Sequence, residues 1–103
     1  MASIVIIGAG AVGSYYGALL ARAGHAVRFV MRRDLDSVLR GGLRIESPKG
    51  DFRLQNVAAF ATPEEAGVAD WVICSLKATA ITAAAALIRP CVGPNTRIVA
   101  LMN

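Results

Sequence analysis

The sequence predicts an α/β fold, a doubly wound parallel sheet with an added β-hairpin, and three observations lead to this expectation. Two apolar runs, 4–7 and 72–76, lack polar alternation and are typical of parallel strands buried on both faces. Helical patterns separate the predicted strands, which favours right-handed crossovers within one sheet. Apolar and charged residues alternate over positions 43–54, which predicts a short antiparallel hairpin.

A glycine motif follows the first predicted strand. Gly8, Gly10 and Gly13 have Gly-x-Gly-x-x-Gly spacing, which suits a tight turn, a close approach of backbone to a pyrophosphate, and close packing of the following helix. The N-terminus of that helix, expected over 11–23, favours an anion. We therefore predict a Rossmann-type phosphate loop, formed by Gly8, Ala9, Gly10, Ala11, Val12 and Gly13.

The remaining elements follow in order. Gly24 is expected to end the first helix, a strand covers 26–31, and a short helix follows Asp34. The hairpin over 43–54 has a type I turn at 47–50. A strand at 57–61 precedes a helix with Thr62 at its N-cap, Pro63 at N1 and Glu65 at N3. We expect a strand over 70–76, an alanine-rich helix over 79–88, a turn at 92–95 and a last strand over 97–101.

Composition limits the classes of protein. The chain has 103 residues, 55% of them hydrophobic and 17% charged, so we expect one folded domain over 1–103 and not a disordered segment. No apolar run is long enough for a membrane span and no signal peptide is evident, so a cytoplasmic location without a membrane partner is expected. Cys74 and Cys91 lack metal-ligand or Cys-x-x-Cys spacing, and both are interpreted as reduced, with no metal site.

The end of the second strand indicates the cofactor. Chains that bind NAD usually carry an acidic residue there for the ribose 2′-hydroxyl, whereas this chain has Arg32 and Arg33. Guanidinium groups bind a 2′-phosphate through charge-assisted hydrogen bonds, so the predicted cofactor is NADP(H). Two alternatives remain. Asp34 could bind the ribose 2′-hydroxyl of NAD, or the two arginines could be solvated side chains at the end of a strand.

Two further positions are expected at the same edge of the sheet. The first and fourth strands are neighbours in the usual order, so Lys77 should face the glycine loop and reach the pyrophosphate or the nicotinamide ribose. The alternative is that Lys77 is a solvated surface lysine without a role in cofactor binding. Asn103 follows the last strand, where a carboxamide could hydrogen-bond a nicotinamide or a substrate.

Together these residues resemble the ketopantoate reductase (2-dehydropantoate 2-reductase) family. The resemblance covers the whole chain and rests on the segments 8–13, His25 and Val27, Arg32, 76–78 and 102–103. It implies hydride transfer from NADPH to the keto group of 2-dehydropantoate, giving pantoate for pantothenate and coenzyme A synthesis. It also implies that Arg32 binds the 2′-phosphate, Lys77 lies beside the cofactor, and Asn103 contacts both nicotinamide and substrate.

The resemblance also implies a second domain that these 103 residues do not include. Members of this family continue into a helical C-terminal domain that supplies a lysine as general acid and a substrate-binding glutamate, so no catalytic residue is assigned here. Loss of a general acid typically costs about 10² to 10⁴ in rate, so we expect a fragment that binds NADPH and turns over poorly. Apolar surface that a second domain would cover should make the chain self-associate as a homo-oligomer.

Other functions stay open. The chain could be the first half of another NADP-dependent reductase or hydroxyacid dehydrogenase, or a nucleotide-sensing domain without chemistry. Nucleic-acid binding has only scattered basic residues in its favour, without interleaved stacking aromatics, and is not expected.

Overall fold

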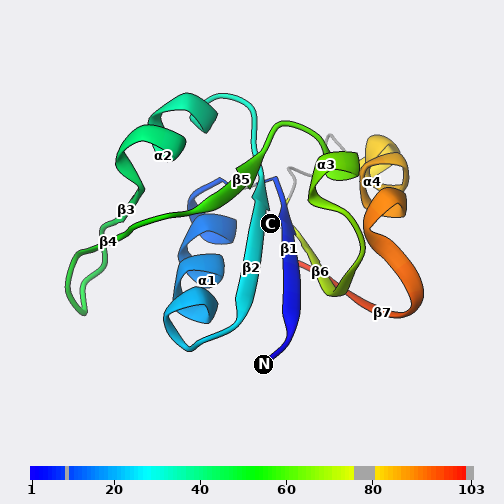
Figure 1. The fold of residues 1–103 in the computed structure, drawn as a ribbon, viewed down its shortest axis with the longest axis horizontal. Helices are drawn as coiled ribbons and strands as arrows, with labels where there is room; N and C mark the ends of the chain where they lie inside the picture. Colours follow the sequence, from blue (N-terminus) through cyan, green and yellow to red (C-terminus); the bar gives the residue numbers. More distant parts are fainter. Residues whose placement is uncertain (9, 76–80, 102–103) are drawn as a thin grey trace.

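The computed structural model describes residues 1–8, 10–75 and 81–101 and confirms the α/β fold (Figure 1). Five parallel strands form one sheet in the order β5-β2-β1-β6-β7, which puts the first strand between the second and the fourth of the sheet as expected. The strands are β1 (Ser3–Ile7), β2 (Ala26–Val30), β5 (Ala58–Phe60), β6 (Ala69–Cys74) and β7 (Val92–Ala100). Because β1 and β6 are neighbours, their carboxyl ends lie at one edge of the sheet.

Helices lie on both faces of this sheet. Figure 1 shows α1 and α2 on one side of β2 and β1, and α3 and α4 on the other side. Alternate residues of β1 point to the two faces, so Ile6 joins one buried cluster and Val5 joins the other. The helices are α1 (Ala11–Arg22), α2 (Leu35–Gly41), α3 (Pro63–Ala66) and α4 (Ile81–Ile88), followed by the short 3₁₀ helix η2 (Arg89–Cys91).

The first helix packs on the sheet through small residues. An added Cβ at Gly17 would lie 2.5 Å from Cε2 of Phe29 and 3.0 Å from Cγ1 of Ile6, so only glycine fits this contact without a shift. The helix ends where Gly24 adopts a φ of +102°. The amides of Gly24 and His25 donate to the carbonyls of Ala21 and Leu20, which is a Schellman motif. The predicted end of this helix is therefore confirmed.

The hairpin is confirmed, although it forms a sheet of its own. Strands β3 (Leu43–Ile45) and β4 (Phe52–Leu54) pair antiparallel as a two-stranded sheet that is separate from the five-stranded one. The amide of Gly50 donates to the carbonyl of Ser47 across the predicted turn. Arg22 of α1 lies over the ring of Phe52, 4.2 Å from its centroid, which places the hairpin beside α1.

The last strand begins earlier than expected. The sequence predicts a turn at 92–95, but β7 already starts at Val92, opposite Ala69, before the register shifts and regular pairing resumes at Arg97. Thr96 explains the irregular stretch, since its hydroxyl accepts from the amide of Gly93 and donates to the carbonyl of Ala69. The turn residues therefore form a bulge within β7.

Candidate functional site: a phosphate loop at the edge of the sheet

The glycine loop has the backbone geometry expected for a phosphate site. Gly8 follows β1 directly and adopts a φ of +76°, a conformation that favours glycine. The amide of Gly10 then donates to the Gly8 carbonyl at 2.8 Å, which closes the turn into α1. An added Cβ at Gly10 would meet no atom within 4 Å. The loop therefore leaves open space where a pyrophosphate would approach its backbone.

In the part of the chain that the structure describes, no side chain caps the first turn of α1. Gly10 is the N-cap and makes no side-chain cap hydrogen bond, and the first turn contains no acidic residue. The amide of Ser14 makes the first intrahelical bond, to the Gly10 carbonyl. The preceding amides, of Ala11, Val12 and Gly13, are the ones that a helix N-terminus offers to an anion. These residues fit a dinucleotide diphosphate.

Gly13 joins this loop to the end of β6. An added Cβ at Gly13 would lie 3.0 Å from Cβ of Ser75 and 3.2 Å from the Gly8 carbonyl oxygen. Ser75 is held in place because its amide donates to the carbonyl of Ile7 at 2.8 Å. Ser75 is not among the predicted site residues, although its place directly after a buried strand is a signal that could have found it.

The paired arginines lie at the same edge, after β2. Ile7 pairs with Val30 in the register of β1 and β2, so the chain leaves both strands at one level of the sheet. Arg32 and Arg33 are exposed there. The adjoining Asp34 is the N-cap residue of α2 but makes no side-chain cap hydrogen bond. Both guanidinium groups and this carboxylate therefore remain available to a ribose or its phosphate.

Three predicted site residues, Ala9, Lys77 and Asn103, lie outside the described residues. Their contacts with a cofactor or substrate stay predictions. The described part of the site consists of Gly8, Gly10, the backbone of Ala11, Val12, Gly13, Arg32 and Arg33.

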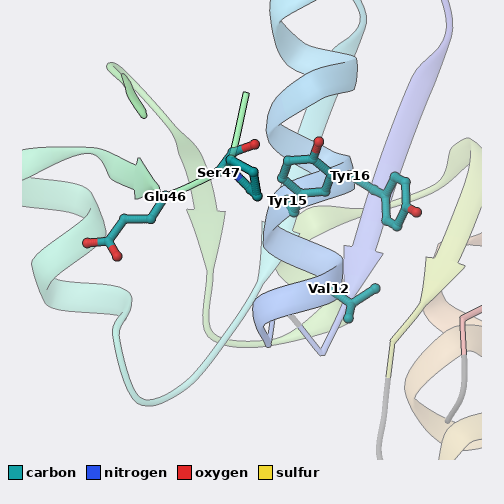
Figure 2. A pocket seen from close by; sticks show the side chains of 6 residues that line it. Val12, Tyr15, Tyr16, Glu46 and Ser47 are labelled. Atoms are coloured by element: carbon teal, nitrogen blue, oxygen red, sulfur yellow. The ribbon is translucent and has the colours of Figure 1, made fainter. Parts of the chain in front are cut away.

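A cavity of about 450 Å³ lies on the outer side of α1, beside the hairpin turn (Figure 2). Among the described residues of the predicted loop, Val12 alone belongs to its lining. In Figure 2, Tyr15 lies near Ser47 of the hairpin turn, whereas Tyr16 points away from the hairpin. The cavity therefore lies beside the predicted phosphate loop, on the hairpin side of α1. Its lining is Val12, Tyr15, Tyr16, Glu46, Ser47 and Pro48.

Another arginine, Arg28, has a structural role. Its guanidinium donates to the carbonyl of Ala66 and, at 3.0 Å, to that of Val68. These bonds tie β2 to the segment between α3 and β6 and satisfy carbonyls at the end of a helix. Arg28 thus has a structural role, whereas the exposed Arg32 and Arg33 remain candidates for binding a ligand.

Cys74 and Cys91 are both buried, and neither forms a disulfide. Burial raises the pKa of the Cys91 thiol, which donates to the Pro63 carbonyl at 3.4 Å. Among the residues that the structure describes, no group of three or more His, Cys, Asp or Glu side chains could hold a metal ion. Within the same ranges, no helix combines the length and apolar character that crossing a bilayer requires.

Comparisons with known proteins identify a family and a shared fold. The family model for ketopantoate reductase PanE/ApbA matches residues 4–103. A 2-dehydropantoate 2-reductase from Nostoc sp. is 37% identical over 98 residues, which cover 95% of this chain and 31% of the relative. One from Mesorhizobium japonicum is also 37% identical, over 97% of this chain and 31% of the relative.

A crystal structure of 2-dehydropantoate 2-reductase from Geobacter metallireducens superposes with a TM-score of 0.95 and 46% identity, covering 98% of this chain and 34% of that one. The chain thus spans about a third of the length of the relatives it matches. From the family match and the shared fold, this chain belongs to the ketopantoate reductase PanE/ApbA family.

Proposed function

We propose that this chain is the NADPH-binding domain of a 2-dehydropantoate 2-reductase, which reduces the keto group of 2-dehydropantoate to give pantoate. Its relatives of that name support the reaction. The observation that carries the choice of cofactor is the pair of exposed guanidinium groups, Arg32 and Arg33, at the end of β2 beside an open phosphate loop. Such groups bind a 2′-phosphate well and give no advantage to a 2′-hydroxyl.

Each described residue has a defined part in this proposal. The open backbone at Gly10 admits the pyrophosphate, and the first amides of α1 bind it. Gly13 allows α1 to approach Ser75, which keeps the loop and the end of β6 together. Arg32 and Arg33 bind the 2′-phosphate and so orient the adenosine end. When bound, the cofactor supplies the hydride that reduces the keto carbon.

The remaining roles depend on family resemblance. Lys77 is proposed to lie beside the cofactor, and Asn103 to contact nicotinamide and substrate. Relatives carry about two thirds of their length outside the matched segment, which spans 31% of the Nostoc protein. We therefore propose that this chain alone binds NADPH but reduces 2-dehydropantoate poorly or not at all.

The test is a change of charge at Arg32. Binding of NADPH and of NADH is measured by isothermal titration for the chain and for Arg32→Asp. Hydrogen bonds to charged groups contribute about 1.5 to 3 kcal/mol, so NADPH should bind roughly 10-fold to 100-fold more tightly than NADH. Arg32→Asp should remove most of this preference by weakening the binding of NADPH.

Arg40→Asp is the matched control, because Arg40 is exposed on α2 and undergoes the same change of charge. It should keep the preference for NADPH. An NADPH to NADH affinity ratio that is the same in the chain and in Arg32→Asp would refute the assignment of the cofactor. Equal binding of oxidised and reduced forms, with no preference for the phosphate, would favour a nucleotide-sensing domain.

A further inference from the structure

Three charged residues follow β2 directly, and they do not all carry the same charge. The Met31 amide donates to the carbonyl of Phe60 at 3.0 Å, so the chain stays paired with β5 up to a buried side chain before it turns toward α2. Arg32, Arg33 and Asp34 come next, and all three are exposed. In Figure 1 this segment lies at the same edge of the sheet as the turn from β1 into α1. One carboxylate thus follows two guanidinium groups where an adenosine ribose is expected.

The Asp34 carboxylate does not cap the helix that it precedes. An aspartate at an N-cap normally has an extended backbone and accepts from an amide of the first turn, as Thr62 does at the start of α3. Asp34 instead has a φ of −104° and a ψ of 14° and makes no such bond, although its carbonyl accepts from the Val38 amide at 2.9 Å. Among the residues that the structure describes, neither arginine forms an ion pair with it. The carboxylate is therefore available to a ligand.

The adenosine ribose of NADPH has two neighbouring oxygens that differ in chemistry. Its 2′-oxygen carries a phosphate, whereas its 3′-oxygen is a hydroxyl that donates a hydrogen bond. A guanidinium donates to a phosphate, and an ionised carboxylate accepts from a hydroxyl but repels a phosphate. Positive charge alone attracts a phosphate at either oxygen, because the two positions are adjacent. A carboxylate next to the arginines therefore distinguishes the two positions.

We propose that Asp34 is a specificity-determining residue, which accepts a hydrogen bond from the ribose 3′-hydroxyl while Arg32 and Arg33 bind the 2′-phosphate. The site then selects adenine nucleotides phosphorylated at the 2′-oxygen against those phosphorylated at the 3′-oxygen, since a 3′-phosphate would lie against the carboxylate. This proposal rests on the proposed function, because it requires a phosphate at the two arginines. It adds a choice between two phosphorylated isomers to the choice between NADPH and NADH.

Adenosine 2′,5′-bisphosphate and adenosine 3′,5′-bisphosphate test the proposal, because they have the same composition and charge. Their binding is measured by isothermal titration for the chain and for Asp34→Asn, which removes the charge and keeps the shape of the side chain. The 2′,5′ isomer should bind the unchanged chain roughly 10-fold to 100-fold more tightly than the 3′,5′ isomer. In Asp34→Asn this affinity ratio should fall at least about fivefold, chiefly because the 3′,5′ isomer is no longer repelled.

Asp36→Asn is the matched control. Asp36 is exposed in the first turn of α2 and undergoes the same change of charge. A general effect of removing one negative charge acts equally on both isomers, so this variant should keep their affinity ratio. Urea unfolding followed by circular dichroism shows whether each variant is folded. If Asp34→Asn does not fold, Asp34→Ser takes its place, because serine is also a favoured N-cap residue.

Equal affinity of the chain for the two isomers would overturn the proposal, and so would an affinity ratio that is the same in the chain and in Asp34→Asn. A fall of the ratio in Asp36→Asn as large as in Asp34→Asn would also overturn it, since the effect would then come from net charge. The affinities for NADPH and NADH are measured on the same chain. A preference for NADPH keeps the cofactor assignment even when the isomers bind equally, whereas the absence of this preference refutes both proposals.

Discussion

Replacing Gly17 with alanine tests how closely α1 is seated on the sheet. The added methyl group would lie 2.5 Å from Cε2 and 2.9 Å from Cζ of Phe29, and 3.0 Å from Cγ1 of Ile6. Ordinary carbon contacts are about 3.5 to 4.0 Å, so the overlap with the ring is about 1 Å. Phe29 is 1% exposed and Ile6 is 0% exposed, so neither side chain has room to withdraw.

Two opposing effects set the size of the change. Alanine is favoured over glycine inside a helix by about 0.8 to 1.0 kcal/mol. Overpacking a core typically costs about 1 to 3 kcal/mol, and two rigid neighbours place this site in the upper part of that range. The difference predicts that Gly17→Ala lowers the free energy of unfolding by about 1 to 2 kcal/mol. In a domain of this size, that corresponds to a midpoint roughly 4 to 15 °C lower.

Urea unfolding followed by circular dichroism measures this change, and Gly41→Ala is the matched control. Gly41 is also helical, but its added Cβ would meet only the tip of the Arg53 side chain, at 3.4 Å. Gly41→Ala should therefore leave stability unchanged or raise it. If Gly17→Ala were as stable as Gly41→Ala, the close seating of α1 on Phe29 would be refuted.

Three other changes test separate features. Gly10→Ala should weaken NADPH binding at least about tenfold, because its methyl group enters the open space that the pyrophosphate would occupy. The free energy of unfolding should change by no more than about 1 kcal/mol. Isothermal titration and urea unfolding measure the two effects, and an unchanged NADPH affinity would count against phosphate binding at this loop. Hydrogen bonds from Ser3 hold the pKa of the Asp70 carboxyl below its ordinary value, so its contribution to stability is present near neutral pH and is lost as pH falls through that lowered pKa. Asp70→Asn should thus destabilise at pH 7 and not at strongly acidic pH, and an equal difference at both would contradict the reasoning. The buried Cys91 thiol, with its raised pKa, should react with Ellman's reagent far more slowly in the native than in the urea-unfolded chain.

The features that the sequence predicted well are local ones. Thr62 accepts from the Glu65 amide at 3.3 Å, as expected for an N-cap, because capping involves residues three positions apart. Gly24 ends α1 for a similar reason, since glycine adopts a positive φ far more readily than other residues do. The turn after β1 and the start of α1 also belong to this group, because Gly8 and Gly10 lie next to the elements they connect, whereas phosphate binding there stays a prediction.

The features that the sequence did not predict depend on residues distant in the chain. The bulge in β7 exists because Thr96 bonds to the carbonyl of Ala69, a partner 27 positions away. In the sequence Arg28 is one of several scattered basic residues, and its bonds to the carbonyls of Ala66 and Val68 form only in the folded chain. Periodicity carries no information about such partners, because it records which face a residue occupies and not what lies opposite it.

The same distinction explains how the candidate site is held together. The loop at Gly8 to Gly13 is predictable as a local motif, but its position relative to β6 is fixed by the bond from the Ser75 amide to the Ile7 carbonyl and by the contact of Ser75 with Gly13. A larger residue at position 13 would push α1 away from this strand, and the N-terminal amides of the helix would move with it. In the proposed site, Gly13 therefore acts on phosphate binding through the packing of two strands and a helix, whereas Gly10 acts on it through the space left open at the backbone.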